Sequence, residues 1–384
     1  MRPEFEEYRP RKIVNGHKHA DGPWFWNRYS AHPYVGCRAG CEFCYSRSRR
    51  YLGGRDPGSY DSHIRVKTNA PELLRKELSP LEPDILACGD WQMPAESRYR
   101  LSRKMLEVAL EHGFPVVVIE RSPLLVRDLD LLKRINEDTW AGVIYSISSL
   151  DPDIKTAFEP RSPSVESRLR AMEELSGAGI EVGTAMMPII PFLGDDEGRL
   201  EEVIEATRDH GGGFVLAGGL TMEGEQARRT LAAAEGLDPA IVPLIREMYG
   251  WTESGKPSYG PPDEYSARIG RLVRDLCRRH GLDYRMPRFI LPGPLAVNKW
   301  LAERLFLESY DLELEEAGKH RVWAYRKAAW QVDDHPENIE CIHRGEGLNG
   351  IRNIEGIGAS ISRRMAEWLS EWTQTELVGR STPI

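Results

Sequence analysis

Short apolar runs alternate with longer amphipathic stretches between residues 31 and 218. Each run has the length of a buried strand, and the stretches between runs space their apolar residues as on one helix face. The predicted strands are Pro33–Val35, Asp84–Cys88, Pro115–Glu120, Gly142–Ser148, Ile180–Met187 and Gly213–Ala217. Helices are predicted at about 70–79, 98–112, 124–136, 163–178 and 197–210. Strands alternating with helices predict parallel βα units, so the fold class is α/β.

The same pattern divides the chain into four parts. Residues 1–30 are polar and aromatic without periodicity, and we expect them to form an arm packed over the body. Residues 31–218 carry the βα units. Residues 219–292 show three further helical stretches and are expected to complete a substrate pocket. A Pro/Gly cluster then marks a boundary, and residues 293–384 are predicted to be an all-α domain.

Composition and charge limit the class of protein. The chain has 384 residues, 41% of them apolar and 29% charged, as in soluble globular proteins. Its apolar runs are too short for a membrane span, and the first residues lack the apolar core of a signal peptide, so we expect a cytoplasmic protein with no membrane partner. The net charge of −8 does not indicate a nucleic-acid binder, yet residues 1–55 hold eleven Lys and Arg against five Asp and Glu. That local excess could attract phosphates or offset negative thiolates.

Three of the six cysteines lie within eight residues. Cys37, Cys41 and Cys44 have the spacing C-x3-C-x2-C. Thiolates suit iron–sulfur chemistry, and three of them can hold three irons of a four-iron cluster. Because no fourth cysteine follows at comparable spacing, one iron would be open to a small molecule. A zinc site would need a fourth ligand, for which His32 is the near candidate, and three cysteines cannot all pair as disulfides. We therefore favour the cluster.

Polar or small residues stand where several predicted strands end. They include Gly89 and Asp90 after the second strand, Arg121 after the third and Ser146 near the end of the fourth. In barrels of βα units, chemistry gathers at the carboxyl ends of the strands. These residues therefore outline a pocket at the end where the cysteine loop lies.

The cysteine spacing, with Tyr45 directly after the last cysteine, resembles that of the radical S-adenosylmethionine (SAM) enzymes. In that family the open iron of a [4Fe–4S] cluster binds the amino and carboxylate groups of SAM, and the reduced cluster cleaves SAM to a 5′-deoxyadenosyl radical. The resemblance implies a partial (β/α)6 TIM-like barrel. Four segments are similar to the spore photoproduct lyase-like branch, often labelled DNA repair photolyases: His32–Tyr45, Arg65–Leu78, Ile154–Pro163 and Leu282–Ile290.

The resemblance assigns roles to individual residues. Cys37, Cys41 and Cys44 would ligate the cluster, Arg121 would reach the SAM carboxylate, and Ser146 would contact the ribose or the amino acid moiety of SAM. Gly89 and Asp90 would line the SAM pocket.

Two further positions bear on the radical chemistry. Cys88 stands where spore photoproduct lyase has a cysteine that returns a hydrogen atom to the product radical; the alternative is that Cys88 fills a gap in the core. Tyr45 matches one of two tyrosines that flank the third cluster cysteine in the lyase. Phe43 replaces the other, so any relay would need Tyr45 and a different tyrosine.

The C-terminal part shows a second resemblance. The strings His320–Pro336 and Leu348–Leu369 are similar to the N-terminal helical domain of family X DNA polymerases, with a helix-hairpin-helix turn at Ile354–Gly358. Gly356 and Gly358 permit a tight turn whose backbone N–H groups can bind a DNA phosphate. The residues expected to contact phosphate or DNA ends are His320, Arg321, Tyr325 and Arg326. Protein docking by the same fold is the alternative.

These resemblances together imply a radical SAM enzyme that acts on DNA, a repair lyase that splits a thymine dimer-type lesion. Its cofactors would be a [4Fe–4S] cluster and SAM, and its partners DNA and an electron donor such as flavodoxin or ferredoxin. Two alternatives remain: radical SAM modification of an intact base or of a partner protein, and a non-catalytic, cluster-bearing DNA-binding protein.

Overall fold

The computed structural model describes residues 3–20, 24–89, 91–251 and 257–372. The chain forms two compact units: residues up to Asn15 with Tyr29–Met286, and Gly16–Arg28 with the chain from Pro287 onward. None of the helices in the described ranges combines the length and the apolar character that a membrane crossing requires. The four-part division of the sequence stays a prediction.

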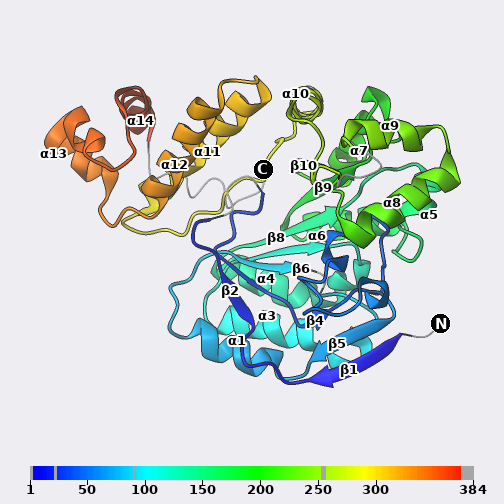
Figure 1. Cartoon of the computed structure of the whole chain (residues 1–384). Helices are drawn as coiled ribbons and strands as arrows, with labels where there is room; N and C mark the ends of the chain where they lie inside the picture. Colours follow the sequence, from blue (N-terminus) through cyan, green and yellow to red (C-terminus); the bar gives the residue numbers. More distant parts are fainter. Residues whose placement is uncertain (1–2, 21–23, 90, 252–256, 373–384) are drawn as a thin grey trace. The chain divides into compact units, whose positions relative to one another are not determined.

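A seven-stranded sheet organises the described residues of the first unit, in the order β10-β9-β8-β7-β6-β3-β2. Its strands are β2 (Val14–Gly16), β3 (Tyr29–Ala31), β6 (Leu86–Gly89), β7 (Val116–Glu120), β8 (Ala141–Ser146), β9 (Glu181–Ile189) and β10 (Phe214–Gly219). From β3 to β10, every neighbouring pair is parallel. The predicted α/β architecture of parallel strands and helices is therefore confirmed (Figure 1).

The first strand of the parallel sheet differs from the prediction. Tyr29–Ala31, rather than Pro33–Val35, pairs with β6, and Ala31 lies opposite Cys88. The strand β4 (Tyr34–Val35) instead pairs antiparallel with β5 (His63–Lys67), which pairs with β1 (Glu4–Tyr8) in a second, three-stranded sheet. Proline has no N–H for a ladder hydrogen bond, so the chain leaves the main sheet where Pro33 follows His32.

Helices cover one face of the main sheet. They are α1 (Ala70–Leu78), α3 (Leu101–Glu111), α4 (Leu129–Asp138), α6 (Val165–Gly177), α7 (Glu197–Asp209) and α10 (Asp263–Arg279). Their buried apolar side chains form one core with the sheet, and Figure 1 shows α1, α3 and α4 gathered on one side of the strands. A register row through Cys88, Val118 and Val143 belongs to this core. Because strand residues alternate, Ile144 and Ser146 face the opposite side.

That opposite side carries a second apolar cluster at the carboxyl ends of the strands. It joins the cysteine loop to α5 (Pro152–Phe158), α8 (Gly224–Leu237) and α9 (Ile241–Met248). Phe43 of the loop and Phe158 of α5 pack together there, with ring centroids 6.3 Å apart. The loop is thus packed into the fold. The short helix α2 (Glu96–Tyr99) precedes α3.

The described residues of the second unit form four helices, α11 (Ala296–Leu314), α12 (Lys319–Asp333), α13 (Ile339–Arg352) and α14 (Ala359–Glu371), coloured gold to red-brown in Figure 1. The predicted helical C-terminal part is confirmed. Trp26 packs edge-on against Phe306, with ring centroids 5.5 Å apart. A buried ion pair joins Arg288 to Asp333 at 2.7 Å. Because each charge is paired, this polar core is compatible with burial.

Candidate cluster and cofactor site

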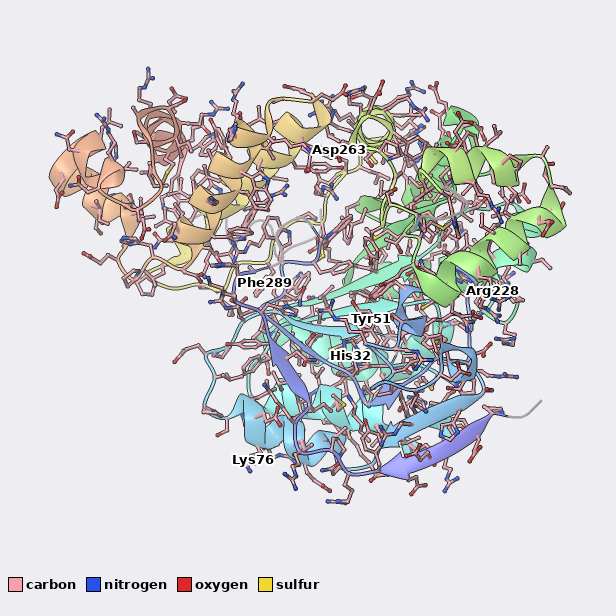
Figure 2. The ribbon with its side chains drawn as sticks, in the orientation of Figure 1. His32, Tyr51, Lys76, Arg228, Asp263 and Phe289 are labelled. Carbon is pink, nitrogen blue, oxygen red and sulfur yellow. The ribbon has the colours of Figure 1, made fainter. Side chains whose placement is uncertain are left out.

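The three cysteines lie on one loop that follows β3 and β4. Cys41 is buried, Cys37 and Cys44 are half-buried, and all three are free thiols. Gly36 opens the loop with φ +93°, and a Cβ there would lie 2.6 Å from the Tyr60 carbonyl oxygen. Only glycine fits that close approach, which fixes where the loop leaves the sheet. Figure 2 labels His32 and Tyr51, which precede and follow the cysteines in the chain.

A buried arginine holds the loop from behind. The Arg47 side chain is fully buried; its Nε donates to the Cys41 carbonyl at 3.2 Å and its Nη2 to the Gly40 carbonyl at 2.7 Å. Asp61 supplies a carboxylate 3.6 Å away, and the guanidinium lies 4.9 Å from the Tyr60 ring centroid. In the sequence, Arg47 is one of eleven basic residues between positions 1 and 55. Its position inside an Arg-rich run gave no sign that it alone is buried.

The donor set fits a four-iron cluster. Within the described ranges, no three His, Cys, Asp or Glu side chains converge as they would on one metal ion. A cluster does not need such convergence, because each cysteine binds a different iron, whereas a zinc ion needs four ligands around one point. The Arg47 guanidinium binds the backbone between the first and last cysteines, so a positive charge lies close to a loop that would carry anionic thiolates.

The thiols themselves show how metal would be taken up. Burial raises the pKa of the Cys41 thiol to about 12. In the metal-free protein this thiol therefore keeps its proton at neutral pH, and iron would have to displace that proton. The Cys44 Sγ lies 3.2 Å from the Tyr60 hydroxyl. A thiolate at Cys44 would accept a hydrogen bond from that hydroxyl.

Helix α8 supports the other side of the cysteine loop. Gln226 Nε2 donates to the Phe43 carbonyl at 2.8 Å, and Arg229 pairs with Glu42 at 2.6 Å. Both partners on the loop lie between Cys41 and Cys44. The loop is therefore held by α8 as well as by Arg47.

Arg121, predicted to contact SAM, lies beside the cysteine loop. Its guanidinium is 5.5 Å from the Phe43 ring centroid, its Nη2 donates to the Met187 carbonyl at 3.2 Å, and its Nε lies 3.6 Å from Glu159. Burial alone would raise the pKa of Glu159, but the charges of Arg121 and Arg168 outweigh it and hold that pKa below its ordinary value. The ionised Glu159 thus fixes the Arg121 cation at the edge of the loop.

Ser146 ends β8 on the face turned away from the helices. It is buried, and its carbonyl accepts from Arg168 Nη1 at 2.7 Å. Two residues on, the Ser148 hydroxyl is buried without a partner among the described residues. Ser148 lines a small pocket with seven other residues: Phe43, Ser149, Ile154, Lys155, Phe158, Glu159 and Ile190. The pocket joins the cysteine loop to the strand ends, where polar residues were predicted to gather.

The residues predicted at the end of β6 differ in their surroundings. The Gly89 carbonyl lies 3.0 Å from His32 Nδ1, next to the start of the cysteine loop. Asp90 lies outside the described residues. Cys88 is fully buried on the helix-covered face, with its Sγ 3.6 Å from the Leu86 carbonyl. Of the two alternatives for Cys88, this placement favours the core residue, because Ser146 and the pocket lie on the other face of the sheet.

Tyr45 lies beside Tyr51, a tyrosine that no sequence pattern indicated. Its ring is half exposed, and its centroid is 5.4 Å from that of Tyr51, which is also exposed. Arg50 lies over the Tyr51 ring at 5.6 Å. The fold thus places a second phenol beside Tyr45. Phe43 has no hydroxyl and cannot take part in a radical relay.

The predicted DNA-contact residues fall into two groups. Gly356, with φ +79°, and Gly358, the N-cap of α14, form an exposed turn after α13. His320 and Arg321 are exposed on α12. Tyr325 is buried among the helices, and Arg326 pairs with Glu313 at 3.0 Å. Tyr325 therefore offers its ring to the helix packing and not to a ligand.

The chain is similar to several known proteins. Residues 32–206 match the family described as the radical SAM superfamily. An uncharacterised protein of Mycobacterium tuberculosis is 26% identical over 238 residues, 60% of this chain and 70% of that protein. An uncharacterised protein of Methanocaldococcus jannaschii is 29% identical over 170 residues, 44% of this chain and 63% of that protein.

A solved structure extends the comparison to the fold. A spore photoproduct lyase mutant with bound AdoMet and dinucleoside spore photoproduct matches with a TM-score of 0.54 at 18% identity, over 74% of this chain and 82% of that chain. At that identity the match shows a common fold. The cysteine spacing, the parallel sheet and these matches identify residues 32–206 as a radical SAM domain, whose cofactors are a [4Fe–4S] cluster and SAM.

Proposed function

We propose that the protein is a radical SAM repair lyase that acts on DNA and splits a thymine dimer-type lesion. One observation carries the proposal: a single chain combines the cysteine loop of a radical SAM domain with a helical unit that has an exposed Gly-containing turn and a basic helix. The fold match supports the substrate class, because the matched spore photoproduct lyase is bound to a dinucleoside spore photoproduct.

The residues of the domain have distinct tasks. When bound, the reduced cluster supplies the electron that cleaves SAM to a 5′-deoxyadenosyl radical. Cys37, Cys41 and Cys44 hold three irons, and the buried Arg47 stabilises their loop and offsets its negative charge. The Arg121 guanidinium, held by Glu159, offers a cation for the SAM carboxylate.

Binding of the rest of SAM falls to the strand ends. Ser146 and Ser148 offer hydroxyl groups there, and the unpartnered hydroxyl of Ser148 is a ready hydrogen-bonding group for a bound ligand. The apolar cluster around Phe43 and Phe158 keeps water away from this side, which protects a reactive carbon radical. The lesion base would have to leave the helical stack to reach the cysteine loop.

Return of a hydrogen atom to the product radical is assigned to tyrosine. Cys88 lies on the helix-covered face, so we assign it to the core. Tyr45 and Tyr51 are in ring contact directly after the last cluster cysteine, and both are accessible. A phenol of this pair can give the hydrogen atom of its O–H bond to the product radical. The tyrosyl radical left behind would be returned to tyrosine by an electron from the reductant and a proton from water.

The helical unit would deliver DNA to the domain. The turn at Gly356 and Gly358 presents backbone N–H groups at the start of α14, and such groups bind phosphate oxygens without reading sequence. His320 and Arg321 would add charge. The reductant would be an electron donor such as flavodoxin or ferredoxin. The free cysteines of the described residues suit a reducing compartment, in line with a cytoplasmic location.

The experiment is an anaerobic incubation of reconstituted protein with SAM, reductant and a dinucleotide that contains a spore photoproduct-type thymine dimer. We expect the repaired thymine dinucleotide and 5′-deoxyadenosine to form in parallel. The Cys41→Ser variant should form neither product. SAM cleavage without thymine release from any dimer type would end the lyase assignment.

The same assay separates a lyase from a modifying enzyme. The modifying enzyme remains an alternative because Phe43 stands where the lyase has a tyrosine. A modifying enzyme would leave a new group, or deuterium from labelled SAM, on an intact base or a partner protein. A lyase would instead restore two unmodified thymines.

A further inference from the structure

The outer side of α12 is basic and carries an exposed tryptophan. Val322, Ala329 and Val332 are buried against the neighbouring helices. On the opposite side, four exposed residues follow one stripe at helical spacing: Lys319, His320, Trp323 and Lys327. Trp323 is 47% exposed, which is unusual for so large an apolar ring on a well-packed helix.

The ring of Trp323 is held in place from below. Its centroid lies 6.2 Å from that of Trp330, which in turn stacks on His19 at 4.8 Å. The Arg326 guanidinium lies 5.4 Å from the Trp323 ring centroid. The exposed ring is therefore supported by other rings and flanked by a cation, so little conformational freedom is lost when a flat partner stacks on it.

Two acidic side chains next to the stripe are already paired. Glu313 pairs with Arg326 at 3.0 Å, and Asp334 pairs with Arg28 at 2.8 Å. The stripe itself contains no acidic residue. The surface therefore suits a ligand that combines negative charge with a flat aromatic group.

The stripe runs toward the proposed phosphate-binding turn. Gln331 lies one turn beyond Lys327 on the same side of α12, and a Cβ at Gly356 would lie 3.9 Å from the Gln331 Cγ. From Trp323 to Gln331 the helix rises about 12 Å, or roughly three to four nucleotides at the spacing of a B-form strand. One short nucleic-acid strand can therefore reach from Trp323 to the turn.

We propose that α12 binds a single-stranded segment of nucleic acid, with Trp323 stacked on an unpaired base and Lys319 and Lys327 beside the phosphates. The inference rests on the proposed action on DNA and narrows it, because bases inside an intact duplex do not present a free face to Trp323. Stacking on tryptophan is tolerant of sequence, so the surface would recognise unpaired structure rather than a base sequence. A strand opened around a lesion has that structure.

The test measures binding of the full chain to fluorescein-labelled 12-nucleotide DNA by anisotropy, at several salt concentrations. Trp323→Ala is expected to weaken binding of single-stranded DNA roughly tenfold, with an unchanged salt slope. Trp323→Phe should recover most of the affinity. Lys327→Gln should instead reduce the salt slope by about one. The matched control Tyr259→Ala removes another exposed aromatic ring, 57% exposed in the first unit, and should bind like wild type.

The probe itself provides a second comparison. An oligonucleotide of the same length with abasic sites should bind wild type and Trp323→Ala equally. The stacking surface would be overturned if Trp323→Ala and wild type bound normal single-stranded DNA with equal affinity. It would also be overturned if Trp323→Ala lost as much affinity for the abasic probe as for normal single-stranded DNA. Failure of the lyase assay on the free dinucleotide lesion, with these binding results intact, would remove the proposed reaction and leave the surface standing.

Discussion

The hydroxyl of Tyr60 lies 3.2 Å from the sulfur of Cys44, inside the fold and next to the Arg47 guanidinium. Tyr60 is buried, so this contact is shielded from water. A hydrogen bond to a cluster sulfur stabilises the reduced, more negative cluster and is one of the levers that set its potential. The contact therefore couples a side chain that holds no metal to the electron chemistry of the loop.

Tyr60→Phe removes this hydrogen bond with little change in volume. The midpoint potential of the reconstituted cluster is expected to become more negative, because the reduced state loses a donor. Redox titration followed by electron paramagnetic resonance measures the shift. Tyr51→Phe, which alters a tyrosine that contacts Tyr45 instead, serves as the control and should leave the potential where it is.

Arg47→Leu tests the support behind the loop. The substitution removes the side-chain donor from the carbonyls of Gly40 and Cys41, of which Cys41 keeps only the Cys44 N–H at 3.3 Å, and it removes the buried partner of Asp61. The free energy of unfolding is expected to fall by about 3 kcal/mol. Iron content after reconstitution should fall as well. Urea unfolding and iron analysis measure both effects. Arg49→Leu, two residues along and exposed, should match wild type; an Arg47→Leu protein with wild-type stability would contradict the buried clamp.

Arg121→Gln should change how stability depends on pH. The pKa of Glu159 lies below its ordinary value in the folded protein, so its ionised form contributes stability that is present above the pKa of the unfolded chain and is lost as the pH falls through the folded pKa. Removing the Arg121 charge raises the folded pKa. Stability should therefore begin to fall at a higher pH than in wild type.

Thermal unfolding between neutral and acidic pH follows this effect. Arg49→Gln, which removes an exposed cation, is the control for a general loss of positive charge. An acid limb identical to that of wild type in Arg121→Gln would show that Glu159 depends on Arg168 alone.

Cys88→Ala separates the two alternatives for this thiol. If Cys88 is a core residue, Cys88→Ala should lower the free energy of unfolding by on the order of 1 kcal/mol and leave the products of the reaction unchanged. Tyr45→Phe should instead divert the product radical and yield side products. Chromatography of the products, with urea unfolding of the same samples, measures both. Side products from Cys88→Ala and none from Tyr45→Phe would reverse the assignment.

Much of the fold could be predicted because apolar runs and helix faces repeat regularly along the first unit. The main error concerned Pro33–Val35. The apolar run indicated a strand, but the strand pairs with β5 and not with the main sheet. Strand pairing depends on residues far apart in sequence, here Tyr34 with Val66, and periodicity does not report it. The strands β1 and β5 were missed because their charged positions broke the apolar pattern expected of buried strands.

The site shows the same division. The spacing of the three cysteines predicted the cluster loop directly, and Arg121 was placed beside it because strand ends meet at one edge of the sheet. The face on which Cys88 lies could not be predicted, because it depends on the register in which β6 pairs with its neighbours, and a slip of one residue in that register turns every side chain to the other face. Burial of Arg47 among several exposed arginines, and the contact between Tyr45 and Tyr51, depend on the folded path of the loop.

The bond from Gln226 to the Phe43 carbonyl, with the ion pair from Arg229 to Glu42, has a consequence for how the protein can be divided. A fragment cut at residue 206, where the family match stops, would lack α8 and leave the segment between the second and third cysteines without its outer support. The smallest piece expected to keep a cluster intact therefore runs on to Met286, at the end of the first compact unit.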